Sequence, residues 1–421
     1  MRKIFFLSLI LCAAKALAQD NPTVILPNTN DTRVITTGVP FLMIASDARA
    51  GGMGEMGVAT SADAYSQQWN PAKYGFIEKQ IGVGVSYTPY LSQLVNDIAL
   101  MNLTVYNRIS DRSAWAASIK YFSLGDIEFT EQVGNDIVSQ GTQRPNEFAF
   151  DASYTLRLTD RYAMAVTGRF LSSDLKIPSE GVDAKAANSF AVDVSGYYQS
   201  EEIAYDNYDG RWRGGFAVTN IGPPIKYDQS VGDEYDSYLP TNLRLGAGFD
   251  FIFDAYSKLS LVGEVNKLLV PTPPILGTEW SYVDNDGNGE YDENVDELDE
   301  NISGTNEVIY SGQDDNVSFV SGMFQSFYDA PGGLSEELKE FTWALGAEYW
   351  YADSFALRAG YFNEAESKGA RKFFTLGAGF TYNVIKIDMS YLFSASKVRN
   401  PLENTLRFSL TLNFGEEYDE Y

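Results

Sequence analysis

A strict alternation of apolar and polar residues recurs along this chain and limits the folds open to it. In the segment 148–158 every second residue is apolar or aromatic, and the residues between are small or polar. The segment 404–414 repeats the pattern. A period of two places the two sets on opposite faces of a β-strand. Segments of about ten such residues, separated by turns, are typical of strands in a membrane-spanning barrel.

The pattern occurs often enough to build a closed barrel. The sequence therefore predicts an all-β fold, a transmembrane antiparallel β-barrel of about fourteen strands. The candidate strands are 80–88, 97–107, 112–123, 148–158, 161–172, 188–199, 211–219, 241–252, 257–267, 341–351, 354–363, 372–383, 384–394 and 404–414.

The connections between these segments are sorted by length. If both chain ends face the periplasm, every second connection should be a short turn. All but one of those connections are short, whereas 124–147, 173–187, 220–240 and 268–340 are long. A soluble β-sandwich has no reason to sort its loops in this way, so the sorting favours the barrel.

The first residues resemble a secretory signal. A short basic start is followed by an apolar stretch at 4–14 and a small-x-small pattern at 16–18, which predicts a signal peptide over 1–18, cleaved before Gln19. Cys12 is the only cysteine and lies inside this signal. No later run of apolar residues is long enough for a transmembrane helix, so a closed barrel is the remaining way across a membrane.

Composition excludes several classes of function. The chain has no His, which rules out a Ser-His-Asp triad, a Cys-His pair and a histidine metal site. A net charge of −26 disfavours nucleic acid as a partner. We find no carboxylate or Ser-Lys pair with catalytic spacing, so we expect no enzyme. The motif 52–57 matches G-x-G-x-x-G but lacks the strand and helix of a dinucleotide site, so we interpret it as close packing.

Residues on the predicted lumen face carry both signs of charge. They could line a polar conduit or pair with one another in a narrow interior. The mixture of signs favours a paired network, since a pore selective for one ion sign would show a bias. These residues are Lys120, Asp151, Arg157, Arg169, Asp193, Arg213, Arg244, Glu264, Glu348, Arg358, Lys386 and Asp388.

Residues 19–78 precede the first strand and are rich in small residues over 41–76, which predicts a segment that plugs the lumen. Their motif DAR, GGMGEMGVATSADA and WNPA resembles the N-terminal signature of the FadL-like barrels and, more closely, that of the PorV (LptO) family. The motif residues are Asp47, Arg49, Gly52, Gly54, Gly57, Trp69, Asn70 and Pro71.

The resemblance implies an outer-membrane protein of a Gram-negative-type envelope, with loops facing the exterior, that serves type IX secretion without enzymatic activity. It implies binding of the C-terminal signal domains of exported cargo. The cargo would come from a giant translocon barrel (SprA or Sov) and pass to a PorU-like sortase complex. Outer-membrane lipid is a further expected partner. The alternative is FadL-like uptake of long-chain fatty acids or other hydrophobic molecules, but the closer match at 39–74 favours secretion.

One predicted extracellular loop, 268–340, spans 73 residues, carries 17 Asp or Glu, and has Lys339 as its single basic residue. Its apolar, proline-stiffened start either packs on the barrel rim or, together with loops 124–147 and 220–240, forms a docking surface. The candidate partner-binding residues are Leu268, Leu269, Val270, Pro271, Pro273, Pro274, Ile275, Leu276 and Trp280.

An acidic turn in this loop matches the first part of a calcium loop. Val295 stands where the bidentate Glu would be, and Asp296 could replace it. The alternative is an acidic, solvated turn without a metal. The possible calcium ligands are Asp284, Asp286, Asn288, Glu290, Asp292 and Asp296, and no other cofactor is predicted.

The expected organisation is thus a signal peptide (1–18), a plug segment (19–78), a barrel (79–415) and an acidic C-terminal tail (416–421).

Overall fold

The structure is a computed structural model. The residues it describes are 22–28, 33–92, 95, 97–133, 136–175, 186–227, 236–298, 307–396, 403 and 405–418. The predicted signal peptide lies outside the described residues, as does the end of the acidic tail beyond Tyr418.

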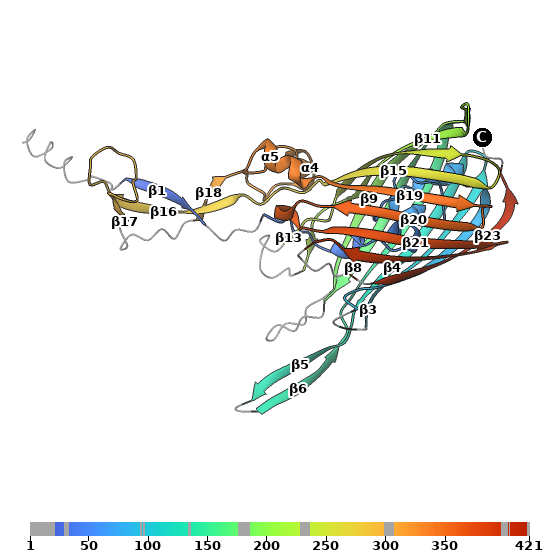
Figure 1. Cartoon of the computed structure of the whole chain (residues 1–421). Coiled ribbons are helices and arrows are strands. Elements are labelled where there is room, and N and C mark those ends of the chain that lie inside the picture. Colours follow the sequence, from blue (N-terminus) through green and yellow to red (C-terminus); the bar gives the residue numbers. More distant parts are fainter. Residues whose placement is uncertain are drawn as a thin grey trace, which may run out of the picture.

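Within the described chain, fourteen strands form one closed antiparallel barrel (Figure 1). Each strand pairs with the next along the chain, and pairing of the first with the last closes the ring. Every predicted strand overlaps one observed strand, so the predicted barrel is confirmed. The strands are β2 (Lys79–Pro89), β3 (Ile98–Ser110), β4 (Ser113–Leu124), β7 (Asn146–Thr159), β8 (Tyr162–Asp174), β9 (Ala187–Gln199), β11 (Asp209–Ile221), β14 (Asn242–Ile252), β15 (Ser257–Leu268), β19 (Thr342–Tyr351), β20 (Phe355–Asn363), β21 (Lys372–Tyr382), β22 (Ile385–Ser394) and β23 (Leu406–Glu417).

Alternation along each strand separates the outer wall from the lumen. In β7, Phe150 and Tyr154 are exposed, whereas Asp151, Ser153 and Thr155 are buried. An outward apolar face and an inward polar face are what a bilayer requires of a barrel strand. The exposed apolar residues of the strands therefore form the lipid-facing belt.

The two ends of the barrel differ in their connections. Tight connections such as 111–112, 160–161 and 383–384 gather at one end, which we name the short-turn end. The opposite, long-loop end carries two small hairpin-like additions and the long insertion between β15 and β19 (Figure 1). The additions are β5 (Ile127–Val133) with β6 (Asp136–Gln143), and β12 (Ile225–Lys226) with β13 (Asp236–Ser237). A further short strand, β10 (Ile203–Ala204), pairs with β11.

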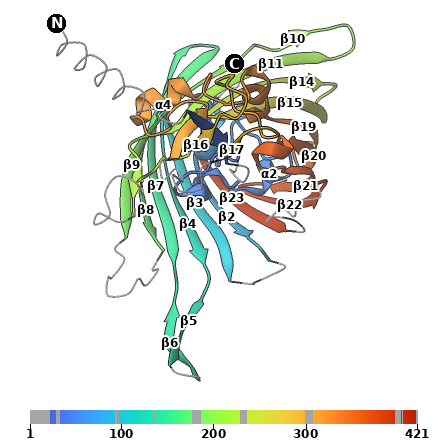
Figure 2. The ribbon, with the colours of Figure 1, turned by 90° about the vertical axis from the view of Figure 1, so that its left-hand side faces the viewer.

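Residues 39–77, the N-terminal segment, are packed within the barrel (Figure 2). Asp47 starts α2 by accepting a hydrogen bond from Ala50 N, and Asn70 starts η2 by accepting one from Ala72 N. Pro71 occupies the first position of η2, where its missing N–H costs nothing. The segment contains η1 (Pro40–Met43), α2 (Ala48–Gly51), α3 (Ser66–Trp69) and η2 (Pro71–Phe76).

The insertion between β15 and β19 folds into a small sheet and short helices. β16 (Ile275–Val283) is the central strand and pairs with β17 (Glu297–Leu298) and β18 (Glu307–Ser311). The helices α4 (Phe319–Gln325), α5 (Leu334–Glu337) and η5 (Leu338–Glu340) follow, and η6 (Glu366–Lys368) lies in the next long-end connection. Among the described residues, no helix combines the length and apolarity needed to cross a membrane.

The described start of the chain lies at the long-loop end. Strand β1 (Thr23–Pro27) pairs antiparallel with β16 and completes the sheet of the insertion (Figure 1). β23, in contrast, ends at the short-turn end. The assumption that both chain ends lie on the same side of the membrane is therefore wrong for β1. This strand lies at the long-loop end because its backbone groups hydrogen-bond to β16.

Candidate functional site

Most charged side chains of the lumen lie in ion pairs. Arg169 bridges Asp151 (2.5 Å) and Asp193 (2.9 Å). Arg358 Nε contacts Glu348 Oε1 at 2.7 Å on neighbouring strands. All predicted lumen residues except Lys386 are buried. These contacts confirm the paired network over the open polar conduit, since buried charges are tolerated when they are paired and hydrogen-bonded.

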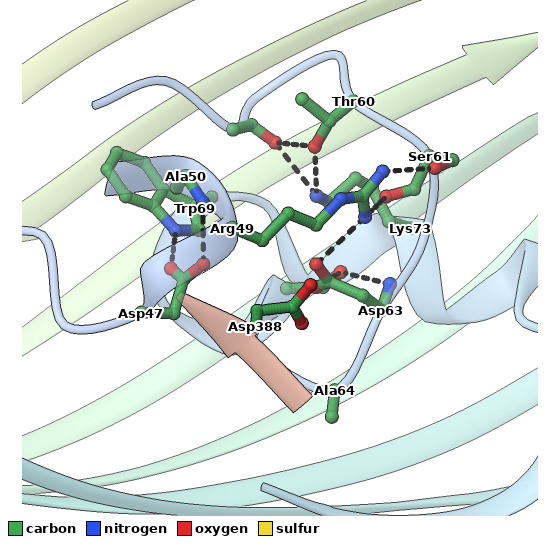
Figure 3. Close-up of polar contacts among 12 residues, drawn as sticks. Asp47, Arg49, Ala50, Thr60, Ser61, Asp63, Ala64, Trp69, Lys73 and Asp388 are labelled. Carbon is green, nitrogen blue, oxygen red and sulfur yellow. Dashed lines mark hydrogen bonds and ion pairs between the residues drawn. The ribbon is translucent and has the colours of Figure 1, made fainter. Parts of the chain in front are cut away.

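The charged side chains of the N-terminal segment bond to the barrel wall and to one another, and Figure 3 shows the contacts of Arg49 and Lys73 within the segment. Arg49 Nη2 lies 2.7 Å from Glu348 Oε2 on β19, and its Nη1 lies 2.9 Å from Asp63 Oδ2. Lys73 Nζ donates to Gly57 O at 2.8 Å and to Thr60 Oγ1 at 2.9 Å. These cations therefore hold distant turns of the segment against each other and against the barrel wall.

The aromatic and amide residues of the motif complete the attachment. Trp69 Nε1 donates to Asp47 Oδ2 at 2.8 Å. Asn70 Nδ2 donates to Gly196 O on β9 at 3.0 Å, and Pro71 O accepts from Thr155 Oγ1 on β7 at 2.8 Å. The motif thus contacts strands on several sides of the barrel.

The motif glycines allow close approach of backbone to backbone. Gly54 has φ +75°, and a Cβ there would lie 2.9 Å from Tyr361 O on β20. A Cβ on Gly57 would lie 2.3 Å from the Trp69 ring, and Gly52 packs against Gly377 on β21. The interpretation of the G-x-G-x-x-G match as close packing is therefore correct.

A cavity of about 740 Å³ opens between the N-terminal segment and the long-loop end of the barrel. Its lining is mostly apolar, with a few charged groups toward the loops. Representative lining residues are Phe41, Ile44, Phe122, Leu268, Arg371 and Lys368.

The predicted partner-binding stretch divides into a buried part and an accessible part. Leu269 and Val270 are 6% and 2% exposed, and Pro271 and Pro274 are also buried. Leu268 lines the cavity. The buried residues pack on the rim and are closed to a partner in this structure. The remaining candidates, Pro273, Ile275, Leu276 and Trp280, are partly exposed.

The insertion sheet exposes apolar residues that the sequence analysis did not single out. Ile25 on β1 and Val283 on β16 are 39% and 48% exposed. Ile309 and Tyr310 on β18 are 42% and 51% exposed. The β-branched and aromatic runs at 23–27 and 307–311 were the available signals for these strands. Of the other two suggested docking loops, 124–147 forms the β5–β6 hairpin, and 228–235 of the second lies outside the described residues.

An ion-pair cluster fastens the insertion to the barrel mouth. Arg33 Nη2 and Lys368 Nζ contact Glu336 Oε1 at 2.6 Å and 2.7 Å. Burial alone would raise the pKa of Glu336, but the hydrogen bonds from Lys368 and Arg33 lower that pKa to about 2. In contrast, burial and the neighbouring Glu337 raise the pKa of Asp329 to about 6. Glu336 therefore stays ionised at neutral pH, while Asp329 is close to its titration point.

The acidic turn brings part of the predicted calcium set together. Carboxylate oxygens of Asp284, Asp286 and Asp296 lie within 4.8 Å of one another. Three such oxygens at this spacing fit a hard cation such as Ca²⁺. This group holds carboxylates only, so the amide of Asn288 and the backbone carbonyl of Glu290 stay predicted ligands. Asn288 donates to Asp286, and Asp292 accepts from Asn294.

The comparisons with known proteins agree with this architecture. A family model described as "Type IX secretion system protein PorV" matches residues 27–275. No curated protein sequence matches the chain.

Several solved barrels resemble the chain at low identity. A TodX deltaS2S3 mutant monoaromatic hydrocarbon channel is 11% identical, with 87% of this chain and 99% of that chain covered and a TM-score of 0.49. The Ralstonia pickettii toluene transporter TbuX is 12% identical, with 89% and 100% covered and a TM-score of 0.44. A Pseudomonas aeruginosa FadL homologue is 12% identical, with 91% and 100% covered and a TM-score of 0.41.

The family model covers more than half of the chain and includes the N-terminal segment together with the first nine barrel strands. With the closed barrel that these strands build, it shows that this outer-membrane protein belongs to the PorV family of the type IX secretion system.

Proposed function

We propose that this protein serves type IX secretion as a non-enzymatic docking barrel, which binds the C-terminal signal domains of exported cargo at its long-loop end. The observation that carries the proposal is the insertion sheet. It stands beyond the barrel mouth and exposes Ile25, Val283, Ile309 and Tyr310. Exposed apolar side chains gathered on a folded platform are typical of protein-binding surfaces.

We further propose that the N-terminal segment acts as a plug, so that cargo does not pass through this lumen. The segment fills the interior with buried helices and turns, and Arg49, Lys73 and Asn70 bond it to its surroundings. Opening a path for a polypeptide would break several buried ion pairs and hydrogen bonds at once, which is costly. A closed barrel leaves its outer loops as the working surface.

In this proposal the long-loop end faces the cell exterior. Cargo emerging from the SprA-like translocon would meet the insertion sheet and then be handed to the PorU-like sortase complex. β1 and β18 are the outer edges of a small sheet. An extended segment of a partner could add to either edge as a further strand, which is a recurring mode of protein recognition. Calcium at Asp284, Asp286 and Asp296 would stiffen the turn after β16, as a structural ion.

Site-specific photo-cross-linking tests the docking surface. A photoreactive amino acid at Tyr310, in the native host, should form adducts with exported proteins that share a C-terminal domain. The matched control is Tyr256, which is 64% exposed in the 253–256 turn at the short-turn end and should give none of these adducts. Equal cargo adducts from both positions, or none from Tyr310, would overturn the proposal.

A second candidate function is uptake of hydrophobic small molecules, which the apolar cavity of about 740 Å³ favours. A volume of this size accommodates a drug-sized or acyl-chain ligand. Under this alternative, organic extraction of the purified protein should release about one fatty acid per chain, and Phe122→Asp in the lining should abolish it. Under the secretion proposal, loss of such a ligand leaves cargo cross-linking at Tyr310 unchanged.

A further inference from the structure

A lysine on the outer wall of the barrel is completely covered. In β15, Leu261 and Val265 point outward and are 44% and 41% exposed. Lys267 lies two residues after Val265, on the same outward face of the strand, yet its side chain is 0% exposed. The intervening Asn266 points inward and lines the cavity. Lys267 therefore occupies a belt position at the rim, and some other part of the chain must shield it.

The shield is the segment 318–340, which we name the rim hairpin. Lys267 Nζ lies 2.5 Å from Glu340 Oε2 and 3.3 Å from Glu337 Oε2. The rings of Phe327 and Phe341 lie 5.7 Å and 5.3 Å from the same ammonium group. The rim hairpin thus folds over the outside of the barrel at β15 as well as over its mouth, and Figure 1 shows α4 and α5 beside that end of β15.

The rim hairpin also exposes large apolar side chains that the described chain leaves uncovered. Leu334, Phe324 and Leu338 are 75%, 68% and 63% exposed. Tyr328 is 65% exposed. No charged residue occurs between 316 and 328, although the loop as a whole is acidic. Such a composition would aggregate in water but suits the boundary of a bilayer.

We propose that the rim hairpin rests in the outer leaflet and inserts Phe324, Tyr328, Leu334 and Leu338 into the lipid surface. The lipid occupant is favoured by continuity with the belt. The hairpin leads directly into β19, whose outward Trp343 and Leu345 are 38% and 58% exposed. Aromatic and aliphatic side chains without charges are what the interfacial zone accepts.

This arrangement also explains the pairing of Lys267. Its ammonium group is neutralised by Glu337 and Glu340, so this buried belt position carries no unpaired charge toward the membrane. The inference concerns membrane contact and does not depend on the proposed cargo function.

Depth-dependent fluorescence quenching tests the inference. Because Cys12 is the only cysteine and lies in the predicted signal, Phe324→Cys and Leu338→Cys give singly labelled mature protein. The full barrel, labelled with an NBD dye, is reconstituted into phosphatidylcholine vesicles with and without acyl-chain nitroxide lipid. Heat-modifiable migration confirms that each variant is folded.

We expect nitroxide lipid to quench both labels at least half as strongly as a label at Leu345→Cys in the belt. A label at Asn288→Cys, in the exposed acidic turn, should be quenched by aqueous iodide instead. The inference is overturned if the hairpin labels behave like Asn288. It is also overturned if they are shielded from both quenchers, since that result would assign the surface to a protein contact.

Discussion

At the scale of single residues, ion pairs in the barrel interior differ from those at its surface. Arg49 is 4% exposed and joins the N-terminal segment to Glu348, whereas Arg144 contacts Asp126 in the open. Both pairs are short, so distance alone does not separate them. Burial does, because a buried charge that loses its partner is not rescued by water.

We therefore expect Arg49→Met to lower the free energy of unfolding by about 3–5 kcal/mol, because Glu348 and Asp63 lose a buried partner. The matched control, Arg144→Met, breaks a solvent-exposed pair and should leave the free energy of unfolding nearly unchanged. The thermal midpoint of heat-modifiable migration measures both. Similar midpoints for the two variants would contradict the attachment described for the segment.

Asp329 provides a pH-dependent prediction. Its pKa is raised from 3.8 to about 6, so the folded state binds more protons than the unfolded chain between these values. The contribution of Asp329 to the free energy of unfolding is therefore fully present below pH 4 and is lost as the pH rises through 6. Asp329→Asn keeps an acceptor for Thr272 N without the charge. The variant should slow proteolysis of the insertion at pH 7.5 and have little effect at pH 4, and an equal effect at both pH values would contradict this.

The acidic turn provides a metal-dependent prediction. Millimolar Ca²⁺ should protect the insertion from proteolysis, because it relieves repulsion among Asp284, Asp286 and Asp296. Chelation should remove the protection, and Asp286→Asn should abolish it. Glu293→Gln removes an exposed carboxylate in the same turn that is outside the cluster, and it should leave the protection intact. If the rate of proteolysis does not depend on Ca²⁺, the turn is acidic and solvated and binds no metal.

At the scale of elements, the barrel strands were predictable and the insertion was not. A bilayer imposes an alternation of apolar and polar residues on every strand, so a strand such as 148–158 can be recognised from its own residues alone. The pairing of β1 with β16 joins residues about 250 positions apart, and no local pattern specifies it. The same holds for Leu269 and Val270, since their sequence fits an exposed or a buried position equally well and only the folded chain shows that they are buried.

The N-terminal part of the candidate site was predictable because its motif resembles a family signature. The motif residues Asp47, Arg49 and Trp69 were identified through a family resemblance, and the structure adds the bonds that they make. The buried pairing of Lys267 could not be predicted from the sequence, because a lysine near the end of a strand normally extends its ammonium group into water.

The β1 strand carries an element-scale prediction. Deleting residues 22–27 removes the hydrogen-bond partner of β16 from 277 to 281. We expect protease to cut the insertion at least five times faster, with no loss of the heat-modifiable barrel, because the barrel strands do not use β1. An unchanged cleavage rate would show that β18 and β17 hold β16 without help.

At the scale of the whole molecule, three features act together. The ring of strands closes, the N-terminal segment is bonded inside it, and the insertion sheet stands at one end only. These features support the proposed docking role, because a pore would need an open lumen between two mouths. The apolar cavity lies between the segment and the long-loop end, so a small ligand there is compatible with either candidate function.

Gentle detergent purification from the native outer membrane, with mass spectrometry of the proteins and lipids that accompany the barrel, tests the central claim most directly. Docking in secretion predicts recovery of a giant barrel protein and of exported proteins that share a C-terminal domain. Recovery of the barrel alone, with about one fatty acid bound per chain, would contradict it in favour of hydrophobic uptake.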